Sequence, residues 1–350
     1  MKILIIKLSA IGDVAHTLPA LNILRKIHPN ARIDWLVEEA ASGLIIGHPA
    51  IDNVIISSRK TWINNINCGA LTSTFKEAVG FISALRSTEY DIILDFQGLF
   101  KSGIMAALAR GKRKIGYGKT REGSHYFLNE RFYDYDIEQH AILRYINLLK
   151  TIGIDDIADE ITFGIPVADS DRQALDSLLL QNGWTNGRDI IAINPMAKWK
   201  TKLWLPNRFA EVADQLTRRL QVSAVFTGGK VDRDTVDYIR SAMKEPAIDL
   251  TGKTSLRMLA ALYQRAACLI STDTGPMHIA AALGTPVIAL FGPTAPWRTG
   301  PFGLRHTVIR KAISCSPCFK KHCDNMICMQ RIEVQDVVDS VMRIMEKALS

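Results

Sequence analysis

A strand–turn–helix–strand unit at residues 268–294 constrains the fold of this 350-residue chain more than any other stretch. A short apolar run, 268–270, stops at a dense cluster of turn and helix-capping residues, 271–275 (STDTG). An alanine-rich helical segment follows at 277–283, and a Gly-Thr-Pro turn leads into a second buried strand at 287–291. Free N–H groups at the start of such a helix suit an anion, especially a phosphate. The alternative is that Asp273 or Thr274 merely caps the helix.

The same alternation runs along the rest of the chain. Expected strands lie at 3–6, 33–37, 54–56, 92–95, 190–193 and 222–226. Expected helices lie at 14–27, 75–85, 141–152, 170–181, 207–220 and 255–265, and a final stripe at 334–349 should pack against the body. Repeated strand–helix units favour doubly wound parallel sheets.

A break at 163–166, after the acidic stretch 155–160, divides the chain into two α/β domains, 1–165 and 166–350. At this length two domains are the default, and we expect a cleft between them. The chain contains neither Gly-x-Gly-x-x-Gly nor a Walker sequence, which argues against a classical dinucleotide fold and a P-loop enzyme.

The net charge of +8 and the pI of 9.2 predict an anionic partner. No nucleic-acid-binding motif accompanies the charge, which favours anionic small molecules or lipids over nucleic acid. No apolar run is long enough to span a bilayer, and the apolar N-terminus reads as a first strand and not as a signal peptide. We therefore expect a cytoplasmic protein.

Four of the six cysteines fall in one block: Cys315, Cys318, Cys323 and Cys328. Their spacing is compatible with a structural zinc site. The alternative is a set of reduced thiols in a loop, and a disulfide fits the expected compartment less well.

Three loops of the first half lie where a parallel sheet binds ligands, at the carboxyl ends of strands: 7–13, 95–98 and the basic segment 110–121. Asp13 follows the first strand and is a candidate general base for a hydroxyl nucleophile. Its alternative role is to cap the helix that follows. Lys7, near Asp13, is a candidate for binding an acceptor anion.

The loops of the second half suit a nucleotide diphosphate. Residues 194–204 follow a strand and carry Lys198, Lys200 and Lys202, although a solvated lysine face is the usual alternative. Gly228 and Gly229 permit close approach of the backbone, with Asp232 just beyond them, and Thr254 follows the next strand. Together with Asp273-Thr274-Gly275, these loops should line one edge of the second sheet.

Motifs along residues 1–303 resemble those of the ADP-heptose:lipopolysaccharide heptosyltransferases of glycosyltransferase family 9, nearest to the heptosyltransferase I type. The resemblance rests on KxSxxGD at 7–13, HTLPAL at 16–21, DWxVEE at 34–39, DxQGLxKS at 95–102, RE at 121–122, QH at 139–140, KxW at 202–204, DTGxxH at 273–278 and GPT at 292–294. The pairing of an N-terminal Gly-Asp loop with a distant Asp-Thr-Gly-x-x-His is specific.

The resemblance implies a GT-B fold: two Rossmann-like domains, the first holding the acceptor and the second the nucleotide sugar. It also implies an inverting transfer of L-glycero-D-manno-heptose from ADP-heptose to a Kdo residue of Kdo-lipid A, without a cofactor, by an enzyme peripheral to the inner membrane. Asp13 matches the proposed general base. The residues matched to donor binding are Lys202, Asp232, Thr254, Asp273, Thr274, Gly275 and His278. Those expected to bind the acceptor are Lys7, Ser9, Lys60, Arg121 and His140.

Two departures from the family pattern bear on the donor site. Asp232 stands where a ribose-binding carboxylate is expected, with a shorter side chain, and Lys198-Trp199-Lys200 replaces a hydroxyl-rich donor loop. The alternatives are a type II or III heptosyltransferase with a heptosylated acceptor, a GT-B nucleotide-sugar epimerase, and a non-catalytic protein that binds nucleotide or anionic lipid.

Overall fold

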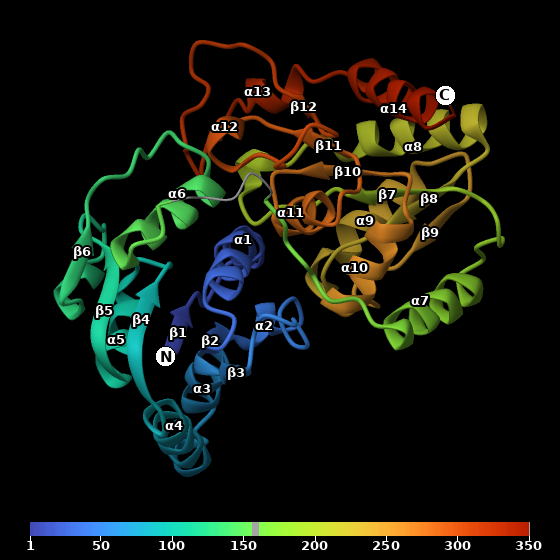
Figure 1. Cartoon of the computed structure of the whole chain (residues 1–350). Helices are drawn as coiled ribbons and strands as arrows, with labels where there is room; N and C mark the ends of the chain where they lie inside the picture. The colour runs from blue at the N-terminus through green and yellow to red at the C-terminus, as the bar shows by residue number, and fades with distance from the viewer. Residues whose placement is uncertain (156–160, 350) are drawn as a thin grey trace. The chain divides into compact units, whose positions relative to one another are not determined.

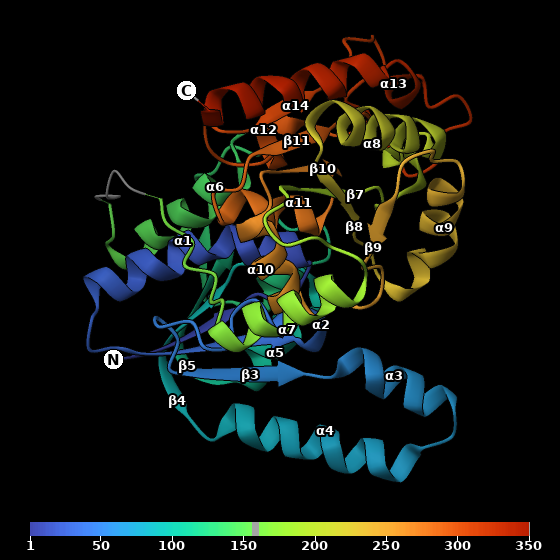
Figure 2. The same cartoon turned by 90° about the vertical axis from the view of Figure 1, so that its right-hand side faces the viewer.

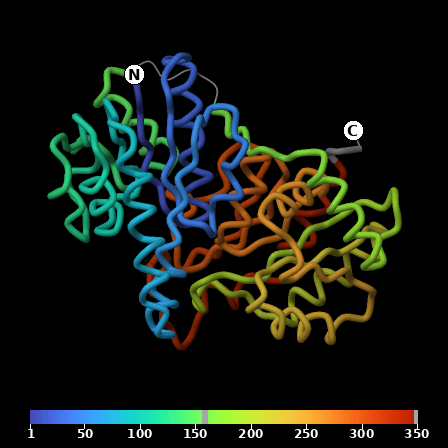
Figure 3. Tube along the Cα trace, turned by 90° about the horizontal axis from the view of Figure 1, so that it is seen from below, coloured from blue at the N-terminus to red at the C-terminus, as the bar shows by residue number. Residues whose placement is uncertain are grey.

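The computed structural model describes residues 1–155 and 161–349, and the chain divides into two compact units, Met1–Pro166 and Val167–Ser350. Each unit is built around one six-stranded parallel sheet. Figure 3 traces the course of the chain from the N-terminus in blue to the C-terminal end in red. Part of the acidic stretch 155–160 lies outside the described residues.

The sheet of the first unit has the strand order β3-β2-β1-β4-β5-β6 (Figure 1). Its strands are β1 (Lys2–Ile6), β2 (Arg32–Glu38), β3 (Asn53–Ser57), β4 (Glu89–Asp95), β5 (Arg110–Tyr117) and β6 (Glu130–Phe132). Its helices are α1 (Ile11–Ile27), α2 (Glu39–Ser42), α3 (Arg59–Asn67), α4 (Leu71–Arg86), α5 (Phe100–Leu108) and α6 (Ala141–Leu148), with 3-10 turns η1 (Ser124–Phe127) and η2 (Leu149–Ile152).

Strand β1 lies in the interior of the first sheet and is buried from Ile3 to Ile6, which explains its continuous apolar run. Leu4 and Ile6 belong to a core with side chains from α4 and α5, such as Leu85 and Met105. Helices α1 and α6 pack against each other. Ile6 lies opposite Leu36 of β2 and Asp95 of β4, so the loops after these strands leave the sheet side by side.

The second sheet has the order β12-β11-β10-β7-β8-β9. Its strands are β7 (Ile190–Asn194), β8 (Ser223–Phe226), β9 (Ala247–Asp249), β10 (Cys268–Thr272), β11 (Val287–Leu290) and β12 (Thr307–Ile309). Its helices are α7 (Asp169–Gln181), α8 (Pro206–Leu220), α9 (Arg233–Ser241), α10 (Leu256–Arg265), α11 (Gly275–Ala282), α12 (Pro296–Thr299), α13 (Ile327–Gln330) and α14 (Val334–Leu349), with turns η3 (Lys200–Lys202) and η4 (Lys230–Asp232).

The C-terminal helix α14 covers the core of the second unit. Val337, Val338 and Val341 are fully buried in a cluster that also holds Phe209 of α8 and Ile193 of β7. The described apolar side chains of this stripe thus pack into the core of the second unit. Among the described residues, no helix is both long and apolar enough to cross a bilayer.

The basic segment 110–121 is not a loop throughout, as the sequence suggested. Residues 110–117 form β5, between β4 and β6. The strand tolerates its cations because they have partners: Arg113 forms an ion pair with Glu130 of β6 at 2.6 Å, and Lys112 pairs with Asp91 of β4 at 3.6 Å. Only residues 118–121 follow the strand as a loop.

Candidate active site

Asp13 lies in the first turn of α1, and its two carboxylate oxygens have different partners. Oδ2 accepts a hydrogen bond from the backbone N–H of Ala10 at 3.1 Å, which is half of a capping box. Oδ1 lies 3.5 Å from the hydroxyl of Tyr145, which donates to it. Ala10 is the N-cap residue of α1, so Asp13 does not take the N-cap position expected as its alternative role. As the third helical residue it contributes to the cap through Oδ2, while Oδ1 faces Tyr145.

Lys7 is buried directly after β1 and linked to Asp13 through Tyr145. Its Nζ donates to the carbonyl oxygen of Phe96 at 2.9 Å and to the hydroxyl of Tyr145 at 2.7 Å. Burial lowers the pKa of Lys7 to about 8, against the opposing effect of the carboxylates of Asp13 and Asp95. Burial and the nearby Asp13 raise the pKa of Tyr145 well above its usual value, so Tyr145 stays a neutral phenol.

The loop that carries Ser9 is held from two sides. The backbone N–H groups of Leu8 and Ser9 both donate to the side-chain oxygen of Gln97, at 3.1 and 3.0 Å. Lys101 of α5 donates to the hydroxyl of Ser9 at 2.6 Å and to Glu38 at 2.7 Å. These contacts hold the backbone of the turn between β1 and α1 in one conformation.

Lys60 belongs to the same network through Glu38. The carboxylate of Glu38 is buried and pairs with Arg59 and Lys60 at 3.3 Å each. The Lys60 side chain is 64% exposed, so its ammonium keeps donors available to an anion from solvent.

His140 and Arg121 stand in different surroundings. His140 caps α6, accepting from the N–H of Ile142 at 3.3 Å, and its ring meets that of His16 edge to face at 5.3 Å. Arg121 is exposed in the loop after β5, and among the described residues no contact of its side chain with the Asp13 group is found. The structure thus brings Asp13 and Lys7 together, and Ser9 and Lys60, but does not join Arg121 to either pair.

In the second unit, Lys202 and Asp273 are in direct contact. Nζ of Lys202 lies 2.6 Å from Oδ2 of Asp273, and the hydroxyl of Thr294 donates to the same oxygen at 2.6 Å. Lys202 also lies 4.7 Å from the centre of the Trp199 ring, an attractive arrangement for a cation. The Lys202 side chain is 17% exposed and the Asp273 side chain 6%, so the pair lies near the surface without being open to it.

The turn 273–275 opens onto helix α11. Thr274 is the N-cap residue and has extended backbone, yet its side chain makes no capping hydrogen bond. The carboxylate of Asp273 contacts Lys202 and Thr294. The interpretation that these side chains merely cap the helix is therefore not what the structure shows. His278 is buried in the first turns of α11, at 8% exposure.

Asp232 and Thr254 follow neighbouring strands, β8 and β9, of the same sheet. Oδ2 of Asp232 accepts from the N–H of Gly229 at 2.7 Å, which anchors the carboxylate at the start of η4. Thr254 is half-buried just before α10, whose N-cap is Ser255. Strand order β10-β7-β8-β9 puts the loops that carry the predicted donor residues along one edge, as the sequence predicted.

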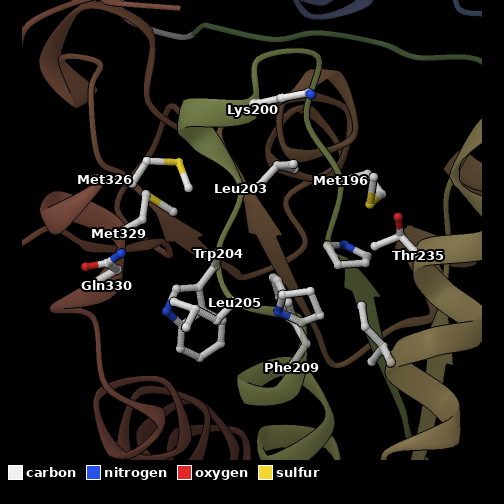
Figure 4. A pocket seen from close by; sticks show the side chains of 13 residues that line it. Met196, Lys200, Leu203, Trp204, Leu205, Phe209, Thr235, Met326, Met329 and Gln330 are labelled. Atoms are coloured by element: carbon white, nitrogen blue, oxygen red, sulfur yellow. The ribbon is translucent and has the colours of Figure 1, made fainter. Parts of the chain in front are cut away.

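An apolar pocket of about 340 Å³ lies beside the 194–204 loop (Figure 4). Trp204, Phe209 and Met329 line its interior, and the amino group of Lys200 lies at its upper end in that view. None of the seven predicted donor residues lines this pocket. It is therefore adjacent to the candidate donor site and distinct from it.

The cysteine block gains no support as a zinc site. Within residues 1–155 and 161–349, no group of three or more His, Cys, Asp or Glu side chains lies close enough to hold a metal ion. Cys328 is buried in the core of the second unit, whereas Cys315 and Cys323 are exposed. The four thiols are thus divided between core and surface.

Two partners of the site were missed from sequence. Tyr145 is a single tyrosine on a helix with an ordinary apolar stripe, and no local pattern distinguishes it. Thr294 ends the Gly-Pro-Thr motif, so its position after β11 was the available signal.

Comparison with known proteins identifies the family of this chain. The model of "Glycosyltransferase family 9 (heptosyltransferase)" matches residues 79–328. Lipopolysaccharide heptosyltransferase 1 of Pseudomonas aeruginosa is 29% identical over 92% of this chain and 87% of its own length. Lipopolysaccharide heptosyltransferase 1 of Escherichia coli is 28% identical, over 89% of this chain and 93% of its own.

Solved structures show the same architecture. The crystal structure of the glycosyl transferase family 9 protein from Veillonella parvula superposes with a TM-score of 0.84 at 26% identity, covering 99% of this chain and 97% of that one. The Escherichia coli ADP-heptose heptosyltransferase II has the same fold, with a TM-score of 0.81 at 23% identity and full coverage of both chains. The GT-B fold class predicted from the sequence is confirmed. Because the family model matches more than half of the sequence, this chain belongs to glycosyltransferase family 9 and is an enzyme, a glycosyltransferase.

Proposed function

We propose that this enzyme transfers L-glycero-D-manno-heptose from ADP-heptose to a Kdo residue of the lipopolysaccharide inner core. Relatives named lipopolysaccharide heptosyltransferase 1, matched over about nine tenths of this chain, support that choice. The observation that carries the chemistry is the carboxylate of Asp13 facing the Tyr145 hydroxyl, with buried Lys7 on the other side of that hydroxyl.

On the acceptor side, Asp13 is the general base. Its Oδ1 takes the proton of an acceptor hydroxyl as the hydroxyl oxygen bonds to the anomeric carbon of heptose and the bond from that carbon to the diphosphate breaks. Direct displacement inverts the configuration at that carbon. Lys7 and Lys60 supply positive charge for the carboxylate and phosphate groups of the acceptor, as do Arg121 and, when protonated, His140, while Ser9 offers a hydroxyl.

On the donor side, negative charge grows on the departing diphosphate. Lys202 and the N–H groups at the start of α11, around Thr274 and Gly275, stabilise that charge. A carboxylate repels phosphate, so Asp273 is assigned to heptose hydroxyls and to holding Lys202 at 2.6 Å. Asp232 is assigned to the ribose, and Thr254 and His278 to the rim of the nucleotide site. No cofactor is required by this scheme.

The acceptor is a lipid, so we propose that the enzyme works in the cytoplasm as a peripheral protein of the inner membrane. Its net charge of +8 favours the anionic acceptor and an anionic membrane surface.

The test is an acceptor panel with mass-spectrometric detection. The enzyme is incubated with ADP-heptose and, in separate reactions, lipid A without Kdo, Kdo-lipid A and heptosyl-Kdo-lipid A. The proposal expects addition of one heptose to Kdo-lipid A with release of ADP, and none to lipid A. Transfer to no acceptor, by protein that binds ADP, would refute it.

A second candidate is transfer to an acceptor that already carries heptose. Lipopolysaccharide heptosyltransferase 3 of Escherichia coli is 27% identical over 82% of this chain, and this similarity supports the second candidate reaction. Preferred use of heptosyl-Kdo-lipid A in the panel would select it.

A further inference from the structure

The helical hairpin α3–α4 carries an apolar surface that the other described residues of the first unit leave exposed. Leu71, Phe75 and Val79 follow one another at intervals of four on α4 and are 60%, 72% and 49% exposed. Residues four apart lie on one face of a helix, so these side chains form a stripe. On α3, Ile63 and Ile66 lie one turn apart and are 45% and 49% exposed.

The hairpin buries little of itself. Helix α3 has no buried residue, and of the sixteen residues of α4 only Thr74 and Leu85 are buried. The two helices run side by side, linking β3 to β4 (Figure 2). Five large apolar side chains exposed within residues 63–79 exceed the isolated exposed apolar residues that are normal on a protein surface.

The hairpin carries a net positive charge. Helices α3 and α4 contain four cations, Arg59, Lys60, Lys76 and Arg86, against one acidic residue, Glu77. An exposed apolar stripe with flanking cations has the composition of helices that lie in the interface of an anionic bilayer, with the apolar side chains in the acyl boundary and the cations at the headgroups.

We propose that α3–α4 is a membrane-docking surface, hereafter the docking hairpin, and that its partner is an anionic phospholipid bilayer. Leu71, Phe75 and Val79 enter the interface, while Lys76 and Lys60 contact lipid phosphates. Ile66 and Leu71 flank the turn between the helices, so the tip of the hairpin enters as well.

The docking hairpin also carries a residue of the candidate acceptor site. Lys60 is the second residue of α3, one turn before Ile63, and it pairs with Glu38. Docking would hold Lys60 at the level of lipid headgroups, where the acceptor of the proposed reaction is found. This link to the acceptor rests on the proposed function, whereas membrane binding by the hairpin does not.

The experiment is flotation of the purified full-length protein with vesicles. Vesicles of phosphatidylcholine with about one third phosphatidylglycerol are compared with pure phosphatidylcholine, at low and high salt. The wild type should float with the anionic vesicles, and less so in high salt. Phe75→Ser should weaken binding about tenfold, as expected for removing one large apolar side chain from the interface, and the triple variant Leu71→Ser, Phe75→Ser, Val79→Ser should abolish it.

Leu304→Ser is the matched control, because Leu304 is the most exposed large apolar residue among those described, at 104%, and lies in the second unit. It should bind vesicles as the wild type does. The substituted side chains are all exposed, so thermal unfolding of each variant should match that of the wild type. Equal flotation of the triple variant and the wild type would overturn the proposal.

Size-exclusion chromatography separates the main rival, a second copy of this chain. A wild type that fails to float and is a dimer, with a triple variant that is monomeric, would also overturn the proposal in favour of self-association. An assay on a soluble acceptor without acyl chains separates docking from catalysis. The triple variant should transfer to this acceptor as fast as the wild type, because no membrane binding is needed. If no variant shows transferase activity but flotation follows the expected pattern, the proposed function fails and the docking hairpin stands.

Discussion

Replacement of Tyr145 by Phe removes one hydroxyl from the centre of the candidate acceptor site. In the wild type that hydroxyl accepts from Nζ of Lys7 at 2.7 Å and donates toward Asp13 at 3.5 Å. Phenylalanine keeps the ring and its packing against Phe96. The variant therefore tests the hydrogen bonds with little change in the core.

The expected effect falls on the pKa of Lys7. A hydrogen bond to a charged group contributes about 1.5–3 kcal/mol, and 1.36 kcal/mol corresponds to one pKa unit. Losing the acceptor destabilises the ammonium form, so the pKa of Lys7 should fall from about 8 by about one to two units. If the charged form of Lys7 binds the acceptor, the alkaline limb of kcat/KM for heptosyl transfer should shift to lower pH by the same amount.

Stability supplies a readout that does not require activity. Since its folded-state pKa of about 8 lies below the usual lysine pKa of 10.5, Lys7 binds more protons in the unfolded chain between these pH values. The unfolding free energy contributed by this group therefore rises as the pH increases from about 8 to 10.5. In Tyr145→Phe that rise should begin one to two pH units lower, and denaturant titrations from pH 6 to 10 measure it.

Tyr117→Phe is the matched control. Tyr117 is buried in the same unit, and its hydroxyl donates to the carbonyl oxygen of Arg144 at 3.2 Å. Its removal should lower stability without moving the alkaline limb. An unchanged alkaline limb and unchanged pH dependence of unfolding in Tyr145→Phe would refute the linkage of Lys7 to Asp13 through Tyr145.

Three further substitutions address the rest of the site. Asp13→Asn should lower kcat by roughly 10²–10⁴-fold with ADP affinity retained, as measured by single-turnover assays and calorimetry; near-wild-type turnover would exclude it as the base. Lys202→Ala should weaken ADP binding at least about tenfold, whereas the exposed Lys198→Ala should change it little; equal effects would point to general electrostatic attraction. Burial raises the pKa of Glu38, but contacts with Lys101 and Lys60 outweigh it, so the net shift is downward. Glu38→Gln should therefore lower the unfolding free energy at pH 7. The difference in unfolding free energy between variant and wild type should shrink as the pH falls through the pKa of the Glu38 carboxyl, and a difference that stays constant with pH would contradict this.

The fold was largely predictable because most of its strands are buried on both faces. Runs such as 3–6 and 190–193 are continuously apolar, and this pattern can be recognised without knowing which strands or helices pack beside them. Strand β5 was missed because its first five residues are RGKRK, and their charges are satisfied by partners on β4 and β6 that sequence alone does not reveal. Strands β9 and β12 are three residues long, too short for a periodic signal.

The candidate site, like the fold, was only partly predictable from the sequence. Residues that follow the strands closely, such as Asp13, Lys202 and Asp273, could be proposed from the sequence because topology brings the carboxyl ends of parallel strands to one edge. The groups that set their chemistry come from elsewhere: Tyr145 is 132 residues from Asp13 in sequence, and Thr294 is 21 residues from Asp273. Such contacts arise from tertiary packing and leave no spacing to detect.

Asp13 illustrates why capping and catalysis were hard to separate from sequence. The capping contact and the proposed proton transfer use different atoms: Oδ2 accepts from the N–H of Ala10, while Oδ1 faces the Tyr145 hydroxyl. Anchoring one oxygen to the start of α1 fixes the orientation of the other, and a base held in one orientation needs no rearrangement when a hydroxyl arrives. In this site the capping contact is therefore a reason to assign Asp13 to the proton transfer, because it supplies the fixed geometry that a general base requires.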